Sequence, residues 1–396
     1  MVHSAVRPRT PSIARQSTLR DHNVGVVLQA IAQRGPLSRA DLSQYTGLTR
    51  ATVSRLVQEL LDAHFAVEDP IPDSTGPGRP ATPLRLSPTR FAGVGVEINV
   101  DYLAGRALAL DGTVLGEFKE PGSFRGSDPA DALALLAQRT EQLLDSLTNF
   151  TITGVVLGIP GLVDTPTGTL LLAPNLRWNR VVPAQFMARD VQLLNDANLQ
   201  GRAAATLQPG RLRSLSSFLY VSGDIGVGAA IVTEGRTALG RHGWAGEIGH
   251  VCVEPDGPLC GCGNRGCLEQ YAGINAILQA AHLPPNGSYE LLLGALERRE
   301  PAALAALERA GWALGIAISD AVNLLDIPDI VLGTNLAPLL PWLHDPIVAQ
   351  LTRRPLASPL AHYTVNPAPP DTMPCSTGGA LTALDVALQH PAAFLS

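Results

Sequence analysis

Near the start of the chain, hydrophobic residues recur at the spacing of amphipathic helices. The first such segment spans residues 23–35 and stops at a Gly-Pro pair. Ser38 and Asp41 then form a capping-box pattern that starts a second, short helix ending at Gly47. Thr49 starts a third helix, whose apolar face is formed by Val53, Leu56, Val57, Leu60 and Leu61. Two helices joined by a short glycine-containing turn are typical of a helix-turn-helix, whose second helix enters the major groove of DNA.

A short ribbon is predicted after the third helix. Leu84 and Leu86 alternate with polar residues and follow the turn-rich stretch 76–80, which predicts a wing with Arg79 near its tip. Residues 21–88 are therefore predicted to form a winged helix-turn-helix domain. Its predicted DNA-binding side chains lie away from the apolar face of the third helix and on the wing: Arg50, Thr52, Ser54, Arg55 and Arg79. The sequence leaves open which of them contact bases and which contact phosphates.

After Pro88 the chain changes to Gly- and Val-rich apolar runs separated by Ala- and Leu-rich segments. Residues 93–100 and 102–110 are predicted to pair as antiparallel strands, and Asp111-Gly112 is a hairpin signal. Helices are predicted at 129–147 and 302–325, and further strands at 152–161, 217–232 and 329–334. This alternation predicts an α/β body over residues 89–396. Residues 1–20 are rich in Pro, Ser and Arg without an apolar period, which predicts a disordered arm.

Composition limits the class of protein. The 396 residues are 45% hydrophobic and only 16% charged, which excludes a chain that is disordered as a whole. No run of apolar residues approaches the ~18 of a membrane span. The N-terminus lacks the apolar core of a secretion signal. A soluble, cytoplasmic protein without a membrane partner is expected.

The formal net charge of −6 is unevenly distributed. Residues 1–90 hold 11 Arg and no Lys against 7 acidic residues, a net charge of +4, and the remainder holds 18 basic against 28 acidic residues, a net charge of −10. A basic head on an acidic body is typical of an N-terminal domain that binds a polyanion. A three-helix segment can also be a protein-interaction module, but the local charge, the arginines of the third helix and the Gly-Arg-Pro wing together favour double-stranded DNA.

The most specific local motif combines one histidine with three cysteines. His250, Cys260, Cys262 and Cys267 have the spacing H-x9-C-x-C-x4-C, and the glycines between them allow the backbone to turn tightly around an ion. One imidazole and three thiolates suit a closed, tetrahedral Zn²⁺ site. The alternatives are buried free cysteines or a disulfide, and disulfides are disfavoured in the cytoplasm. Cys252 could also replace His250 as a ligand.

The stretch GWAGEIGHVCVEPDGPLCGCGNRGCLEQYAG closely resembles the signature of the ROK family, named for repressors, open reading frames and kinases. The segments that agree with the family are 154–164, 171–179, 193–203, 221–232 and 330–340, and the wing sequence GRPATPLRLSP matches its repressor branch. The resemblance implies an actin-like sugar kinase fold of the ribonuclease H-like type. Such a body has two α/β lobes with a sugar cleft between them, and a zinc ion held by the 250–267 motif.

Paired carboxylates and Asn side chains suit a sugar, because they exchange hydrogen bonds with several vicinal hydroxyls and reject the wrong epimer. By the resemblance, the sugar-binding positions of the family correspond to Asn195, Asp196, Glu247, His250 and Glu269, with Asn175 as an addition. Taken singly, Glu247 could cap a helix, and Asn195-Asp196 could form a turn. His250 could serve both sites, with one ring nitrogen on zinc and the other on a sugar hydroxyl.

The resemblance also raises the alternative of an ATP-dependent sugar kinase with an appended DNA-binding domain, because Asp196 stands where family kinases have their general base. Family kinases carry Asp-x-Gly-Gly-Thr in the first strand pair, where this chain has Glu97-Ile98-Asn99-Val100-Asp101. Their second phosphate turn corresponds to residues 222–228, where Asp224 would lie next to a triphosphate. Backbone amides of Gly-rich turns bind phosphates, whereas a carboxylate repels them.

No kinase activity and no ATP binding are therefore predicted, and Asp196 is interpreted as a vestigial base. The glycines that remain in these turns are attributed to backbone conformations with positive φ, which a fold can require without ATP; they are Gly226, Gly228, Gly333, Gly378 and Gly379.

The sequence thus predicts a sugar-responsive transcriptional regulator, a repressor of carbohydrate-use genes, with Zn²⁺ as its cofactor. Its predicted partners are double-stranded operator DNA, a small sugar effector and further copies of the chain in a homodimer or homotetramer. Oligomerisation is expected because one recognition helix and one wing contact few base pairs. The sequence leaves open the identity of the sugar or sugar phosphate, the choice between repressor and activator, and whether a partner protein replaces the sugar signal.

Overall fold

The structure is a computed structural model that describes residues 16–70, 82–284 and 287–395. The chain divides into two compact units, one formed by residues 1–87 with 386–396 and the other by residues 88–385. The second boundary falls inside the helix α11 (Pro374–Gln389). The sequence predicts a body that continues to residue 396, whereas the structure groups residues 386–396 with the N-terminal unit.

Within the N-terminal unit, the described residues before position 88 form three helices and a two-stranded ribbon: α1 (Gln16–Arg34), α2 (Arg39–Thr46), α3 (Arg50–Asp62), β1 (Ala66–Glu68) and β2 (Leu84–Leu86). The capping box that starts α2 is confirmed, since the Ser38 hydroxyl accepts from the Asp41 amide (3.2 Å) and the Asp41 carboxylate accepts from the Ser38 amide (2.9 Å). Gly47 ends α2 with a φ of 71°. The Thr49 hydroxyl accepts from the Thr52 amide (3.2 Å) and starts α3.

The core of this unit is formed by the apolar faces of its helices. Its fully buried side chains include Val24, Val27, Leu28, Ile31, Leu42, Val53, Leu56, Val57 and Leu60. The short 3-10 helix η3 (Pro391–Phe394) packs on α1, and the Phe394 ring lies edge-on to that of Phe65 with centroids 6.4 Å apart. β1 and β2 pair antiparallel, as predicted for the wing. The predicted wing tip with Arg79, and residues 1–15 of the predicted arm, lie outside the described residues.

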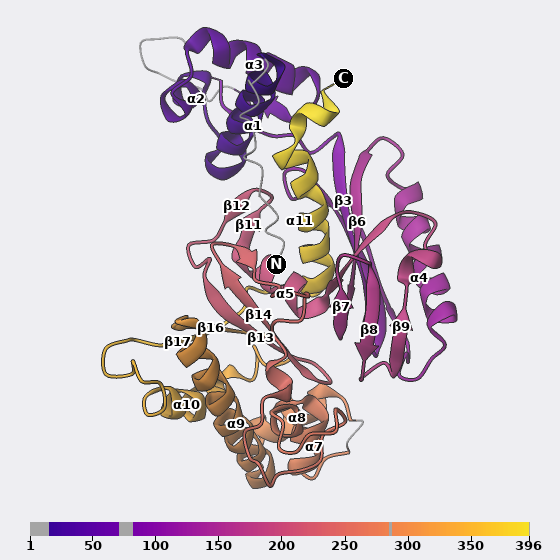
Figure 1. Cartoon of the computed structure of the whole chain (residues 1–396), viewed down its shortest axis with the longest axis vertical. Coiled ribbons are helices and arrows are strands. Elements are labelled where there is room, and N and C mark those ends of the chain that lie inside the picture. The colour runs from indigo at the N-terminus through magenta and orange to yellow at the C-terminus, as the bar shows by residue number, and fades with distance from the viewer. Residues whose placement is uncertain (1–15, 71–81, 285–286, 396) are drawn as a thin grey trace, which may run out of the picture. The chain divides into compact units, whose positions relative to one another are not determined.

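The larger unit, residues 88–385, has two lobes, each built on a five-stranded sheet (Figure 1). The first sheet has the order β10-β6-β3-β4-β5, with β3 (Phe91–Ile98), β4 (Tyr102–Ala109), β5 (Val114–Pro121), β6 (Thr151–Ile159) and β10 (Val191–Asn195). The second has the order β15-β14-β13-β16-β17, with β13 (Phe218–Gly223), β14 (Val227–Thr233), β15 (Arg236–Thr237), β16 (Asp329–Thr334) and β17 (Thr364–Pro367). In each sheet the three strands that come first in the chain pair antiparallel: β3, β4 and β5 in one, and β13, β14 and β15 in the other. The two later strands are parallel to the first of these three: β6 pairs with β3 and β10 with β6 in one sheet, and β16 pairs with β13 and β17 with β16 in the other.

Alternation along β3 determines which helix covers each face of the first sheet. Ala92, Val94 and Val96 belong to a core that also contains the buried leucines of α4 (Pro129–Asp145). Gly93 and Gly95 face α11 instead, where a β-carbon on either residue would collide with the helix backbone. The two glycines therefore allow α11 to lie directly on the sheet.

The second sheet is covered in the same way. Leu219 and Val221 of β13 share a core with α9 (Pro301–Leu325) and α10 (Leu340–Leu351), while Phe218 and Tyr220 face the other side, toward α5 (Asp196–Ala205). Among the described residues, α9 is the one helix long and apolar enough to cross a membrane, but 67% of its apolar window is buried inside the structure. It is placed as a core helix.

The remaining elements are short. They are the strands β7 (Leu162–Asp164), β8 (Thr169–Ala173), β9 (Trp178–Val181), β11 (Thr206–Gln208) and β12 (Arg211–Leu212), the helices α6 (Glu269–Ala272), α7 (Ile274–Ala280) and α8 (Tyr289–Glu297), and the 3-10 turns η1 (Pro183–Gln185) and η2 (Ile248–His250). The predicted pairing of residues 93–100 with 102–110 is confirmed, since β3 and β4 are antiparallel. Asp111-Gly112 connects β4 to β5, however, and the turn between β3 and β4 is formed by residues 99–101.

Candidate functional site

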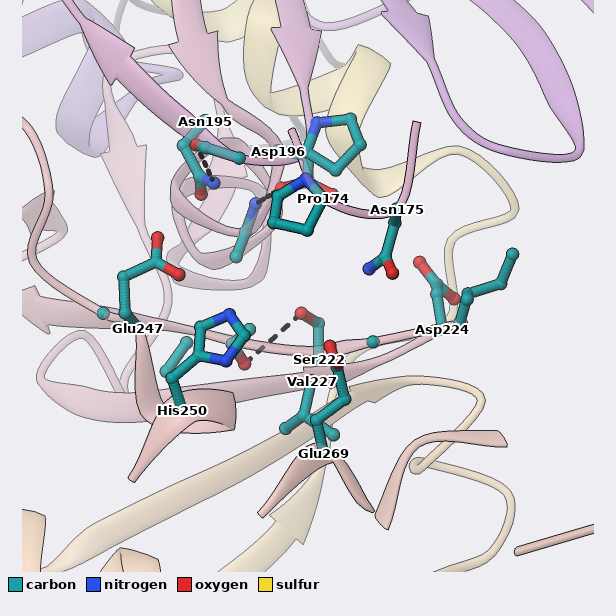
Figure 2. Close-up of a pocket in the computed structure, with 18 of the residues that line it drawn as sticks. Pro174, Asn175, Asn195, Asp196, Ser222, Asp224, Val227, Glu247, His250 and Glu269 are labelled. Atoms are coloured by element: carbon teal, nitrogen blue, oxygen red, sulfur yellow. Dashed lines mark hydrogen bonds between the residues drawn. The ribbon is translucent and has the colours of Figure 1, made fainter. Parts of the chain in front are cut away.

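A pocket in the larger unit brings together all six predicted sugar-binding residues (Figure 2). They come from separate elements: Asn175 precedes β9, Asn195 and Asp196 stand at the junction of β10 and α5, Glu247 precedes η2, His250 ends it, and Glu269 begins α6. Ser222 of β13 and Asp224, in the turn between β13 and β14, also line the pocket. The polar groups therefore converge from both lobes on one space.

The junction of β10 and α5 explains how Asn195 and Asp196 are presented. The Asn195 side chain caps α5, with Oδ1 accepting from the Asn198 amide (3.2 Å) and Nδ2 donating to the Gly161 carbonyl (3.2 Å). Asp196 is the first residue of the helix, and its Oδ1 accepts from the Ala197 amide (2.9 Å). The cap fixes the start of the helix, so that both side chains face the pocket while keeping unused acceptor and donor capacity.

Several carboxyl groups in and beside the pocket are shifted toward their neutral form. Burial, together with the neighbouring charges of Asp224 and Glu247, raises the pKa of Asp196 to about 7. Burial likewise raises the pKa of Asp224 to about 6 and that of Glu97, just behind the pocket, to about 8. Burial also raises the pKa of Glu247. Groups that titrate near neutral pH can both accept and donate hydrogen bonds to hydroxyls.

The loop between β3 and β4 differs from a phosphate-binding turn. The Tyr102 hydroxyl donates to Glu97 Oε1 (2.7 Å), and Glu97 Oε2 is buried without a partner among the described residues. The Asn99 side chain accepts from the Val100 amide (2.7 Å) and lines the pocket. Side chains thus occupy the turn that the resemblance aligns with glycines of family kinases, and the backbone amides of Asn99 and Val100 are already bonded.

The interpretation of the remaining glycines as positive-φ positions is wrong. None of Gly226, Gly228, Gly333, Gly378 and Gly379 has a positive φ. They are needed because other groups lie where a β-carbon would be. At Gly226 that space holds the Glu269 carboxylate and the Asn175 amide, at Gly333 the Tyr220 ring, and at Gly378 the Leu199 backbone.

Beside the pocket, the predicted metal ligands His250, Cys260, Cys262 and Cys267 gather with all their ligand atoms within 4.8 Å of one another. Cys262 Sγ and Cys267 Sγ are 3.7 Å apart, and His250 Nδ1 is 3.8 Å from Cys260 Sγ. Two Zn–S bonds of about 2.3 Å at a tetrahedral angle span about 3.8 Å. The donor set and its spacing therefore fit zinc. Cys252 is outside the group, so His250 is the better fourth ligand.

Four of the five predicted DNA-binding residues lie on the first turns of α3, and the fifth, Arg79, is outside the described residues. Arg50, Ser54 and Arg55 are exposed, and Thr52 is half-buried, with its hydroxyl 2.9 Å from that of Thr49. Arg55 forms an ion pair with Glu59 (2.8 Å). Because Arg55 already has an intrahelical partner, Arg50 is the freer cation at the start of the helix.

The pocket contains residues that the sequence did not predict as ligands. Asn99 and Asp224 enter the sequence interpretation only as departures from the kinase pattern, yet both line the pocket, and Glu97 lies behind them. Their signal is the replacement of glycines by polar residues in turns that face the cleft. Asp224 is held by Asn335, whose Nδ2 donates to its Oδ1 (3.4 Å).

Comparison with known proteins agrees with this architecture. The model of the ROK family matches residues 94–385, and that of the MarR family matches residues 24–70. The chain is 26% identical over 349 residues to a xylose repressor of Bacillus spizizenii, covering 86% of this chain and 89% of that protein. It is 32% identical over 273 residues to a xylose repressor of Caldicellulosiruptor bescii, covering 67% of each.

Solved structures show the same fold. A ROK family transcriptional regulator, described as a homologue of the Escherichia coli Mlc protein, superposes with a TM-score of 0.77 at 24% identity, covering 95% of this chain and 99% of that one. A ROK family glucokinase from Streptomyces griseus, in complex with glucose and AMPPNP, gives a TM-score of 0.61 at 23% identity, covering 73% of this chain and 98% of that one.

The fold therefore defines a protein with an actin-like sugar kinase body and an N-terminal winged helix of the MarR type. The chain belongs to the ROK family, as its sequence predicts. Its named relatives are transcriptional repressors, and the family also contains kinases.

Proposed function

We propose that the chain is a sugar-responsive, DNA-binding transcriptional regulator that represses carbohydrate-use genes in the cytoplasm. The observation that carries the proposal is the convergence of Asn195, Asp196, Glu247, His250 and Glu269 on one pocket, in a chain that also has a helix-turn-helix. The names of its relatives, two xylose repressors, support the same reading.

A sugar ring suits this pocket for a chemical reason. Asp196, Asp224, Glu247 and Glu269 offer carboxyl oxygens in different directions, and Asn175 and Asn195 add amide donors. Hydroxyls both donate and accept, so each can bridge two such groups. An epimer with one hydroxyl reversed leaves a buried group unpaired, which makes such a site selective.

Zn²⁺ is the proposed cofactor, held by His250, Cys260, Cys262 and Cys267. The ion would supply a structural crosslink between η2 and the loop that precedes α6. His250 Nδ1 faces the cysteines, and the same side chain lines the pocket. His250 is therefore the residue through which the cluster would orient a sugar ligand.

Operator DNA is the proposed partner of the N-terminal unit. Arg50, Thr52, Ser54 and Arg55 on α3, with Arg79 in the wing, are the proposed contacts. A homodimer or homotetramer would place several such units on a palindromic operator. The boundary between the two units falls inside α11. Sugar binding would change lobe closure and thereby the separation of recognition helices.

A sugar kinase is the second candidate, because Asp196 occupies the pocket with a pKa of about 7, suited to a general base. Against kinase activity, Asn99 and Asp224 stand in the two turns that would bind the triphosphate of ATP, and both line the space beside the pocket. ATP consumption with a panel of aldoses separates the two functions. Turnover that disappears in Asp196→Asn would establish the kinase.

The proposed function is tested with the full chain in two steps. A thermal-shift screen against neutral and acidic sugars should find a ligand that raises the melting midpoint, because a ligand stabilises the state that binds it. DNA selected from a random duplex library should then bind the chain, and the same sugar should change that affinity. The proposal fails if no duplex is enriched, or if operator affinity is unchanged at saturation with every sugar that binds.

A further inference from the structure

A second cavity of about 970 Å³ opens beside the candidate sugar pocket. The two spaces share the residues Pro174, Asn175, Ile225, His250 and Glu269. A ring held between His250 and Glu269 would therefore have one side directed into the second cavity. A substituent on that side of the ring has room to extend, so a ligand larger than a bare monosaccharide fits.

Two arginines, Arg125 and Arg177, line this second cavity, and both are exposed. Within the described part of the chain, neither side chain has a hydrogen bond or an ion pair. Some other arginines of the body are paired, among them Arg106 with Glu117 and Asp371, Arg139 with Glu120, and Arg202 with Asp385. Unpaired guanidinium groups in a cavity are available to an anion.

The loops that carry the two arginines are tied to each other. The Gly126 amide donates to the Leu176 carbonyl (2.8 Å), and the Trp178 indole donates to the Ser127 carbonyl (2.9 Å). A β-carbon at Gly126 would lie 3.7 Å from Arg177 Cδ. Arg177 itself has a φ of 61°, uncommon for a residue other than glycine. Such a conformation persists where the surrounding bonds hold it, and it is frequent in binding sites.

Charge is divided between the two spaces. The sugar pocket is lined by Asp196, Asp224, Glu247 and Glu269 and by neither Lys nor Arg, whereas the second cavity has two arginines and a single carboxylate, Glu269. Glu269 lies against Gly226, inside the sugar pocket. A ligand that matches this division has a neutral polyol at one end and a negative charge at the other.

A third cavity, of about 710 Å³, is a weaker position for an anion. It is lined by Lys119 and Arg125, but also by Asp101, Asp224 and Asp371. The Lys119 ammonium donates to the Thr372 carbonyl (3.3 Å) and lies over the Tyr102 ring, 4.2 Å from its centroid. Three carboxylates would repel an anion here, and the ammonium of Lys119 already has partners. The third cavity is therefore less suited to an anion than the second.

We propose that the effector is a sugar whose ring lies in the pocket and whose anionic substituent, a carboxylate or a phosphate, is bound by Arg125 and Arg177. This inference rests on the proposed function and names the class of ligand for the same site. The two arginines are then specificity-determining residues, since they add affinity for the acidic sugar and none for its neutral counterpart.

Calorimetric titration of the full chain tests the inference. The neutral ligands are xylose and glucose. The anionic ligands are glucose 1-phosphate and a disaccharide with a terminal glucuronic acid, with inorganic phosphate and free glucuronate as controls for the anion alone. The variants are Arg125→Gln, Arg177→Gln and the double substitution. Arg180→Gln is the matched control, because Arg180 is exposed on β9 and lines none of the three cavities.

We expect one anionic sugar to bind about ten- to a hundredfold more tightly than its neutral counterpart, the range of one or two charge-assisted hydrogen bonds. The double variant should lose this preference and keep the affinity for the neutral sugar, while Arg180→Gln changes neither. The ligand that shows the gain identifies carboxylate or phosphate as the group. Equal affinity for neutral and anionic sugars, or a preference that survives the double substitution, overturns the inference and leaves the proposed function intact. If no sugar of either kind binds, the proposed function fails with it.

Discussion

The carboxylate of Glu269 occupies the space that a β-carbon at Gly226 would need, and the Asn175 amide nitrogen lies 2.7 Å from the same point. Gly226→Ala should therefore displace both side chains from the pocket and lower sugar affinity tenfold or more, because two hydrogen-bonding groups lose their positions. Thermal shift with the identified ligand measures the change.

The control for this substitution is Gly154→Ala in β6, where an added β-carbon meets only Ala383, at 3.6 Å, an ordinary contact. Both variants should fold, and Gly154→Ala should bind sugar as the natural chain does. Undiminished binding in Gly226→Ala would show that Glu269 and Asn175 are not ligands.

These glycines show how far the sequence determines the site. Local patterns predict the capping box at Ser38 and the cap at Thr49, because each is a contact over three residues. The family motif predicts the six pocket residues. Gly226 could not be explained in this way, since its neighbours Glu269 and Asn175 are more than forty residues away in the chain and meet it only in the folded state.

Contacts between residues far apart in the chain also explain why the roles of Asp224, Asn99 and the C-terminus were not predicted. Asp224 and Asn99 line one pocket from different lobes, and no periodicity places them together. Phe394 packs against Phe65 across most of the chain length. Nothing in the local pattern of residues 386–396 indicates that partner, so the domain boundary at the C-terminus was not predictable from it.

Removal of a cluster cysteine should release the metal. Cys260 Sγ is buried and lies 3.8 Å from His250 Nδ1. Cys260→Ser replaces a thiolate with a poor zinc ligand, so the zinc content should fall from about one ion per chain toward zero, with a lower melting temperature. Sugar affinity should fall with it, because His250 loses the bond that orients its ring. Metal analysis of the purified protein and sugar titration measure both effects.

Cys252→Ser is the matched control, since Cys252 lies two residues from His250 but outside the cluster. It should retain zinc and sugar binding. Zinc loss in Cys252→Ser with retention in Cys260→Ser would assign the metal to different ligands. Loss of zinc with unchanged sugar affinity would separate the two sites.

Glu97 predicts a pH dependence of stability. Burial raises the pKa of Glu97 to about 8 in the folded chain, against about 4.3 when unfolded. Between these values the folded state retains a proton that the unfolded state has released, so the free energy of unfolding decreases as pH rises through this window. Glu97→Gln removes the titration and should stabilise the protein at pH 8 by a few kcal/mol, while changing it little near pH 4.5.

Chemical denaturation from pH 5 to 8.5 measures this difference. Glu297→Gln, at an exposed position of α8, controls for the loss of one formal charge and should follow the natural chain. Part of the pH dependence should remain in Glu97→Gln, because burial also raises the pKa of Asp196 and Asp224. Parallel curves for Glu97→Gln and the natural chain would mean that Glu97 is ionised in the folded state.

Arg50 provides the test of the DNA-binding surface. It is the first residue of α3 and is exposed, and its side chain has neither a hydrogen bond nor an ion pair within the described ranges. Residues at the start of a recognition helix contact base edges. Arg50→Gln should weaken binding to the selected operator by about 1–3 kcal/mol and relax the preference at one base pair.

The control is Arg298→Gln in the body, which removes the same charge from another exposed arginine and should leave binding unchanged. Fluorescence anisotropy with single-base operator variants distinguishes the outcomes. A uniform loss over all sequences with a salt slope reduced by about one would place Arg50 on a phosphate. Unchanged affinity and selectivity would exclude the start of α3 from the DNA interface.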